Sequence, residues 1–92
     1  MEIGDIMTTL NTTLINAQGL HARPATLFCK EASQFKSDIK LIYGDKQGNA
    51  KSLIALLALG LTAGAELQVV AEGEDEEVAA KHMADFIGSF QE

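Results

Sequence analysis

The chain has 92 residues with 47% hydrophobic content, so it can close one small core but lacks the length for a second domain. Its net charge of −6 and its few aromatic residues exclude a nucleic-acid-binding protein. A single cysteine, Cys29, excludes an intramolecular disulfide, and we interpret it as a small apolar residue. Because no apolar run could span a bilayer and no signal peptide is recognisable, we expect a cytoplasmic protein without membrane insertion.

The first half of the chain contains two strand patterns, a helix pattern and a turn. Residues 1–7 are expected to form an N-terminal arm, and residues 8–92 a single domain. The patterns in chain order are a strand with Leu10, Thr12 and Leu14; a helix from Ala25 to Phe35 with Leu27, Phe28, Ala32 and Phe35 buried; a strand with Ile39, Leu41 and Tyr43; and a turn over residues 44–48 that leads to a short strand at Asn49.

The second half alternates helix, strand and helix. The patterns are a helix that Ser52 opens and Gly60 closes; a strand with Leu67, Val69 and Ala71; and a helix from Glu74 whose buried stripe is Val78, Met83, Phe86, Ile87 and Phe90. The order βαββαβα predicts an α+β fold in which three helices cover one face of a four-stranded, mainly antiparallel sheet.

His21 stands where the first helix begins, and this position suggests its chemistry. Pro24 suits the first turn of a helix, so the N–H groups of Ala22 and Arg23 at the helix start and the positive end of the helix dipole favour a bound anion there. The Arg23 guanidinium adds a permanent charge that fits phosphate oxygens. Imidazole is a competent nucleophile, so His21 can hold a phosphoryl group covalently, with Arg23 stabilising its charge. A merely structural histidine at the helix start is the alternative.

The second helix is apolar on all sides. Helical geometry directs Leu56 and Leu59 to one side and leaves three large residues exposed, namely Leu53, Ile54 and Leu57. Such a patch is typical of a surface that docks a partner, and homodimer formation is the alternative to transient docking by a monomer. Ser52 is first of all the helix cap, and it is also a candidate regulatory phosphorylation site.

The charge is divided unevenly along the chain. Lys and Arg number six against five Asp and Glu up to Ser52, and one against eight from Leu53 onward. Residues 72–77 carry most of this acidity, which we interpret as a solvated helix start and not a metal site. Arg23, Lys30 and Lys51 are expected to form a positive rim near His21 that suits an acidic protein partner. We assign no role to His82, and no metal or cofactor is expected.

Two stretches resemble the histidine-containing phosphocarrier (HPr) family of the bacterial phosphoenolpyruvate-dependent sugar phosphotransferase system. They are Gly19-Leu20-His21-Ala22-Arg23-Pro24-Ala25 and Asn49-Ala50-Lys51-Ser52-Leu53-Ile54, and the similarity extends from about Thr8 to the C-terminus. The resemblance implies an open-faced β-sandwich. It also implies a carrier that accepts a phosphoryl group from Enzyme I on Nδ1 of His21 and passes it to the A domains of sugar permeases.

The resemblance also bears on partners and on alternatives. The residues expected to dock partners are Leu20, Lys30, Lys51, Leu53, Ile54 and Leu57. In one branch of the family the serine at the position of Ser52 is a kinase target, so an HPr kinase or a transcriptional regulator is a further possible partner. A carrier of the nitrogen-related branch and a purely regulatory HPr-like module are the alternative functions, and His21 argues against the latter.

Overall fold

The computed structural model describes residues 7–15 and 19–89. Its elements are β1 (Thr8–Thr13), α1 (Ala22–Ala32), β2 (Asp38–Tyr43), β3 (Lys46–Asn49), α2 (Leu53–Ala58), β4 (Glu66–Glu72) and α3 (Glu76–Gly88). This is the βαββαβα order that the sequence predicts. Residues 1–6 of the expected arm, and Phe90 of the expected buried stripe, lie outside the described residues.

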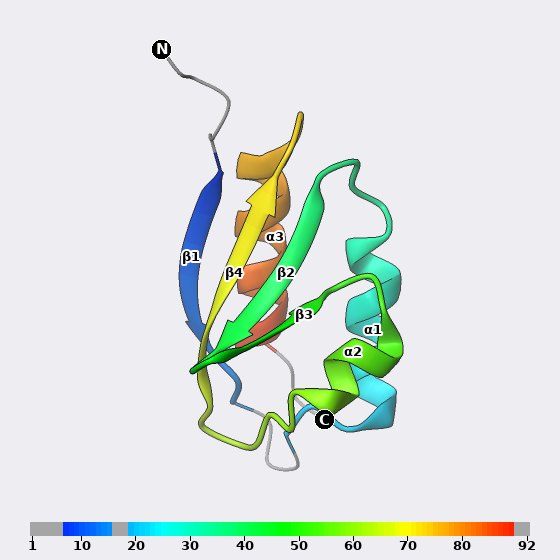
Figure 1. The fold of residues 1–92 in the computed structure, drawn as a ribbon, viewed down its shortest axis with the longest axis vertical. Coiled ribbons are helices and arrows are strands. Elements are labelled where there is room, and N and C mark those ends of the chain that lie inside the picture. Colours follow the sequence, from blue (N-terminus) through cyan, green and yellow to red (C-terminus); the bar gives the residue numbers. More distant parts are fainter. Residues whose placement is uncertain (1–6, 16–18, 90–92) are drawn as a thin grey trace.

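The strands form one antiparallel sheet in the order β1-β4-β2-β3 (Figure 1). Val69 on the central strand β4 lies opposite Leu10 on β1 and Leu41 on β2. α3 packs across β1, β4 and β2, whereas α1 packs against α2 and α3, and α2 also contacts β3. The fold is the α+β open-faced β-sandwich that the sequence predicts.

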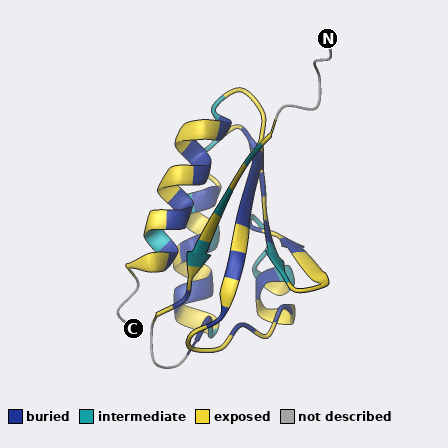
Figure 2. Ribbon diagram, turned by 90° about the vertical axis from the view of Figure 1, so that its left-hand side faces the viewer, coloured by how far each residue is buried: buried dark blue, intermediate teal, exposed yellow. Residues whose placement is uncertain are grey.

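One core lies between the sheet and the helices. Its fully buried side chains include Phe28 from α1, Leu56 from α2, Met83 and Ile87 from α3, and Leu41 and Val69 from the sheet. Figure 2 shows how buried and exposed positions alternate along the strands and around the helices. Within residues 7–15 and 19–89, no helix is both long enough and apolar enough to cross a membrane.

The helix boundaries and faces differ in part from the prediction. α1 begins at Ala22, directly after His21, but it ends at Ala32, before the expected Phe35. Leu27 on α1 is 40% exposed and Val78 on α3 is 66% exposed, although both were expected to be buried. The Phe28 side chain points from α1 into the core. Leu27 is rotated about 100° around the helix from Phe28, so it faces outward. In α3, Ala79 supplies the inward position beside Val78, where a small side chain lets the helix approach the sheet.

The acidic segment before α3 is not simply solvated, which corrects the prediction. Asp75 accepts hydrogen bonds from the backbone N–H groups of Lys36 (3.0 Å) and Ser37 (2.9 Å), and also from the Ser37 hydroxyl. The Ser37 hydroxyl has the largest effect among these donors, and together they lower the pKa of Asp75 from 3.8 to about 2. This carboxylate therefore fastens the α1–β2 connection to the start of α3.

Glu76 is the second acidic residue of this segment with a structural role. It is almost fully buried and accepts hydrogen bonds from the Thr8 hydroxyl (3.0 Å) and from the Gly73 N–H (3.1 Å). Buried carboxylates are tolerated only when they are hydrogen-bonded, and both oxygens of Glu76 are. The segment thus joins β1, β4 and α3.

His82 also has a structural role that the sequence did not predict. Its Nε2 lies 2.8 Å from a carboxylate oxygen of Glu31, so a hydrogen bond joins α3 to α1. The ring stacks on Phe86 and is tilted against Phe35, with centroids 6.2 Å and 5.4 Å away. These contacts make His82 a bridge between the two helices.

The Asp75 contacts generate a prediction about stability and pH. Asp75→Asn should lower the melting temperature near neutral pH, because the charged acceptor of the Ser37 and Lys36 donors is lost. The pKa of Asp75 is about 2 in the folded protein against 3.8 ordinarily, so its charge stabilises the fold above 3.8 and this contribution is lost as the pH falls through about 2. Melting curves recorded by circular dichroism should therefore show that the difference in melting temperature between parent and variant becomes smaller as the pH is lowered.

Asp85→Asn is the matched control for this experiment. Asp85 pairs with Lys81 on the exposed side of α3, where an ion pair contributes little, so the variant should melt like the parent. The role of the Asp75 charge would be contradicted if the difference in melting temperature between Asp75→Asn and the parent stayed the same down to the lowest pH.

Candidate functional site

His21 is the N-cap residue of α1, and its backbone alone begins the helix. Its carbonyl accepts the first helical hydrogen bond from the Ala25 N–H (2.9 Å), and its N–H donates to the Gly19 carbonyl (3.1 Å). The backbone is extended, with φ −88° and ψ −168°, and the side chain makes no capping hydrogen bond. The imidazole is therefore not needed to cap the helix, which argues against the merely structural alternative.

The Nδ1 atom of His21 is buried and has no hydrogen-bond partner among the described residues. A buried polar atom without a partner is uncommon in folded proteins and costs about 1–3 kcal/mol. The residue as a whole is partly exposed, so the ring borders the surface although Nδ1 itself is buried. The Nδ1 atom is therefore not engaged in any contact that holds the described part of the protein together.

The start of α1 offers an anion a favourable environment. Its first turn contains no acidic residue, and both Ala22 and Arg23 are exposed. The N–H groups of the first turn and the positive end of the helix dipole attract negative charge, and the guanidinium of Arg23 adds a full positive charge. Pro24 and Ala25 are buried directly behind them, which holds this turn in place.

Leu20 does not lie on the surface, which corrects its predicted role in docking. It is only 4% exposed, and its N–H donates to the Leu61 carbonyl (3.1 Å) in the segment that follows α2. The buried side chain anchors the chain next to His21 and is not available to a partner.

The predicted positive rim is not gathered around His21. The Lys51 ammonium donates to the Phe35 carbonyl (2.8 Å), just beyond the C-terminal end of α1. Lys30 lies in the last turn of α1, roughly two and a half turns from His21. Both cations therefore complement the negative end of the α1 dipole, and of the three predicted rim residues only Arg23 lies at the helix start.

Ser52 caps α2 as predicted. Its Oγ accepts a hydrogen bond from the Ala55 N–H (3.3 Å), and its carbonyl accepts one from the Leu56 N–H (3.0 Å). The hydroxyl therefore satisfies one of the backbone donors that a helix start leaves unpaired. Lys51, the preceding residue, is directed to α1, so α2 begins beside the C-terminal end of α1.

The exposed apolar surface of α2 is smaller than predicted. Ile54 is 81% exposed and Leu57 is 41% exposed, and their spacing places both on one side of the helix. Leu53 is partly buried and packs against the core, which corrects its expected exposure. We call Ile54 and Leu57 the α2 surface. Leu27 on α1 is a further exposed leucine, which the helical pattern had placed in the core.

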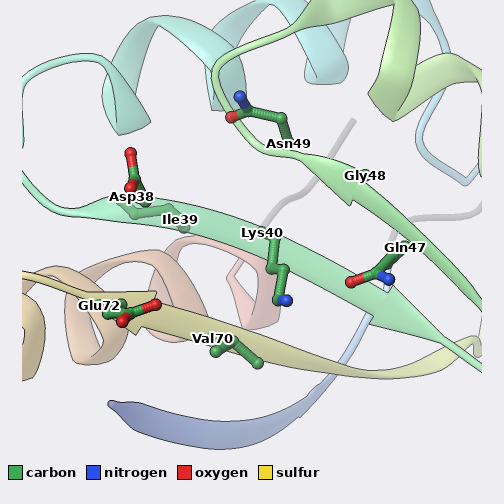
Figure 3. Close-up of a pocket in the computed structure, with 8 residues that line it drawn as sticks. All are labelled: Asp38, Ile39, Lys40, Gln47, Gly48, Asn49, Val70 and Glu72. Atoms are coloured by element: carbon green, nitrogen blue, oxygen red, sulfur yellow. The ribbon is translucent and has the colours of Figure 1, made fainter. Parts of the chain in front are cut away.

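A hollow of about 400 Å³ lies on the sheet, away from these residues (Figure 3). It is lined by Asp38, Ile39, Lys40, Gln47, Gly48, Asn49, Val70 and Glu72, none of which is a predicted site residue. In residues 7–15 and 19–89, no group of three or more His, Cys, Asp or Glu side chains is placed to hold a metal ion. The chemically distinctive group is therefore the α1 start with His21.

Comparison with known proteins identifies the family of this chain. The family described as "PTS HPr component phosphorylation site" matches residues 8–89. The chain is 41% identical over 85 residues to the phosphocarrier protein HPr of Haemophilus influenzae, which covers 92% of this chain and all of that protein. It is 44% identical over 69 residues to the HPr-like protein Crh of Bacillus subtilis, covering 75% and 81% of the two chains.

A solved structure extends the comparison to the fold. The phosphocarrier protein HPr from Bacillus anthracis superposes with a TM-score of 0.87 at 32% identity, covering 90% of this chain and 99% of the other. The family match spans both the α1 start with His21 and α2 with its serine cap. The chain belongs to the HPr family and is a phosphocarrier protein of the phosphotransferase system.

Proposed function

We propose that His21 accepts a phosphoryl group on Nδ1 from a phosphohistidine of Enzyme I and passes it to a histidine in the A domains of sugar permeases. The observation that carries the proposal is the unsatisfied Nδ1 at the start of α1, beside the exposed Arg23. A nucleophile, a permanent cation and the first N–H groups of a helix meet there. The resemblance to HPr proteins supplies the donor and the acceptor.

The transfer step uses only groups at the α1 start. With the ring turned outward and its proton on Nε2, the Nδ1 lone pair attacks phosphorus, a new N–P bond forms, and the N–P bond to the donor histidine breaks. The donor ring keeps the electron pair of the broken bond. The transition state is loose and spreads negative charge over three equatorial oxygens, which the N–H groups of Ala22 and Arg23 and the Arg23 guanidinium stabilise.

The protein acts in this proposal as a stoichiometric carrier and not as an enzyme with its own turnover, because each phosphoryl group accepted must leave again. Binding of the phosphohistidine at the site is accordingly moderate. The carrier works as a monomer in the cytoplasm, with residues 8–92 as the carrier domain. The α2 surface, Ile54 and Leu57, provides the apolar contact for partners, and Arg23 provides the charge that attracts their acidic groups.

A second candidate function is regulation through binding without sugar transport. A relative named HPr-like protein is as similar to this chain as several phosphocarriers are, so identity alone does not separate the two roles. His21 with its unsatisfied Nδ1 favours the carrier. A carrier of the nitrogen-related branch would have the same chemistry and would differ in its partners.

The first experiment removes the proposed acceptor. His21→Ala should abolish phosphorylation by Enzyme I and phosphoenolpyruvate, because the nucleophile is gone, while the fold survives since the side chain caps nothing. Intact mass spectrometry measures the added phosphoryl group. The chain has two histidines, so His82→Ala is the matched control and should still be phosphorylated. Acid-labile phosphate on His21→Ala would contradict the proposal.

Arg23→Lys tests the guanidinium. Lysine keeps the charge but lacks the planar fork that matches phosphoryl oxygens, so the variant should still be phosphorylated but exchange the group about tenfold more slowly. Rapid-quench measurement of transfer from Enzyme I reads this rate. Equal rates for Arg23→Lys and the parent would show that the guanidinium does not contact the transferring group.

Ser52 poses a choice between a helix cap and a regulatory site, and the proposal includes both. A phosphate there would stand at the start of α2 and stabilise it, but it would place negative charge next to the α2 surface that a partner must cover. Ser52→Asp should therefore slow phosphorylation of His21 by at least about tenfold, equivalent to about 1.4 kcal/mol, without lowering the melting temperature.

The opposite pattern is expected for the control, Ser52→Ala. It removes the hydroxyl that accepts from Ala55, so stability should fall by about 1 kcal/mol while the rate of transfer is kept. If Ser52→Asp accepts phosphoryl as quickly as the parent, Ser52 is only a cap and the α2 surface is not where Enzyme I docks.

A further inference from the structure

Gly19 makes an unusually close backbone contact two residues before His21. Its φ is +73°, and a Cβ atom at this position would lie 2.5 Å from the Leu61 carbonyl oxygen and 2.9 Å from the Thr62 Cα. Real Cβ atoms essentially never approach other atoms this closely. Both obstacles are backbone atoms, so no side-chain movement makes room, and any larger residue must push the two segments apart.

A hydrogen bond forms directly beside this contact. The Leu20 N–H donates to the same Leu61 carbonyl (3.1 Å), and both leucine side chains are buried. The Gly19 carbonyl in turn accepts from the His21 N–H (3.1 Å). The backbone position of His21 therefore depends on how closely Gly19 can approach Leu61.

The segment that receives Gly19 is fixed at both of its ends. Gly60 ends α2 with φ +66°, and its N–H donates to the Leu57 carbonyl (3.2 Å). At the other end, Gly64 donates to the Leu14 carbonyl (2.7 Å), and the Leu14 N–H donates to Ala65 (2.9 Å). In Figure 1 this segment runs from α2 toward β4 past the beginning of α1. Hydrogen bonds therefore hold residues 60–65 to α2 at one end and to the end of β1 at the other.

We propose that Gly19 is a positioning residue for phosphoryl transfer. It does not contact the transferring group, and it acts through the Leu20–Leu61 hydrogen bond, which places His21 and the N–H groups of the α1 start relative to α2. A docked partner is held by α2, so the distance between its phosphohistidine and His21 depends on this contact. Misplacement of reacting groups by about 1 Å can slow a reaction about 10²-fold. The inference rests on the proposed function.

The test is Gly19→Ala compared with Gly44→Ala. Gly44 also has a positive φ, +62°, but a Cβ there would meet nothing within 4 Å, and it lies in the turn between β2 and β3. Both variants carry the backbone strain of alanine at positive φ, and only the first carries the clash. Gly19→Ala should accept phosphoryl from Enzyme I at least about tenfold more slowly. Gly44→Ala should match the parent.

Two further measurements separate positioning from docking and from loss of structure. The dissociation constant for Enzyme I, measured by calorimetry, should change by less than about threefold in Gly19→Ala, because the α2 surface is untouched. For comparison, a tenfold loss of binding affinity corresponds to about 1.4 kcal/mol. The rate of hydrolysis of the isolated phosphohistidine should change as well, because the backbone donors at the α1 start have moved. Backbone strain alone, as in Gly44→Ala, should leave the hydrolysis rate unchanged.

The outcomes are distinct. Transfer by Gly19→Ala at the rate of Gly44→Ala would overturn the proposal, and so would a loss of Enzyme I binding that matches the loss of transfer. If Gly19→Ala does not fold, an amide-to-ester replacement at Leu20 removes the N–H donated to Leu61 without adding a Cβ, and an unchanged transfer rate would then overturn it. Phosphorylation of His21→Ala, by contrast, would overturn the proposed function itself.

Discussion

The burial of the first turn of α1 is the constraint on which the functional end of the molecule depends. Pro24 and Ala25 are packed against the core, and Leu20 is buried on the other side of His21. His21 is thus held between two anchored points on the chain while its ring remains partly exposed. The hydrophobic effect thus fixes the backbone on both sides of His21.

α1 and α2 are joined at both ends, and this connection sets the position of His21 relative to the α2 surface. At one end Lys51 donates to the Phe35 carbonyl after α1, and at the other Leu20 donates to the Leu61 carbonyl after α2. The start of α1 therefore lies beside the segment that follows α2, and the start of α2 lies beside the segment that follows α1. A partner that covers Ile54 and Leu57 consequently meets a helix whose position relative to His21 is fixed.

The sequence predicted the element order, the sheet and His21 at a helix start, because these depend on local patterns. The alternation of Ile39 and Leu41, for example, is a property of the strand alone. Predictions failed where tertiary contacts decide. Leu20 is buried and Leu27 is exposed, the reverse of the expectation, because Leu20 contacts the Leu61 segment and Phe28 takes the inward position beside Leu27. Lys51 was assigned to the wrong end of α1, because its partner is a backbone carbonyl that sequence does not reveal.

The backbone character of the α1 start has a consequence for how such proteins diverge. Under the proposed mechanism, the N–H groups that hold the phosphoryl group belong to the main chain, so substitutions at most positions leave them in place. The α2 surface consists instead of two exposed side chains, neither of which belongs to the core. Under that mechanism, partner choice can therefore drift by single mutations while the transfer chemistry is inherited unchanged.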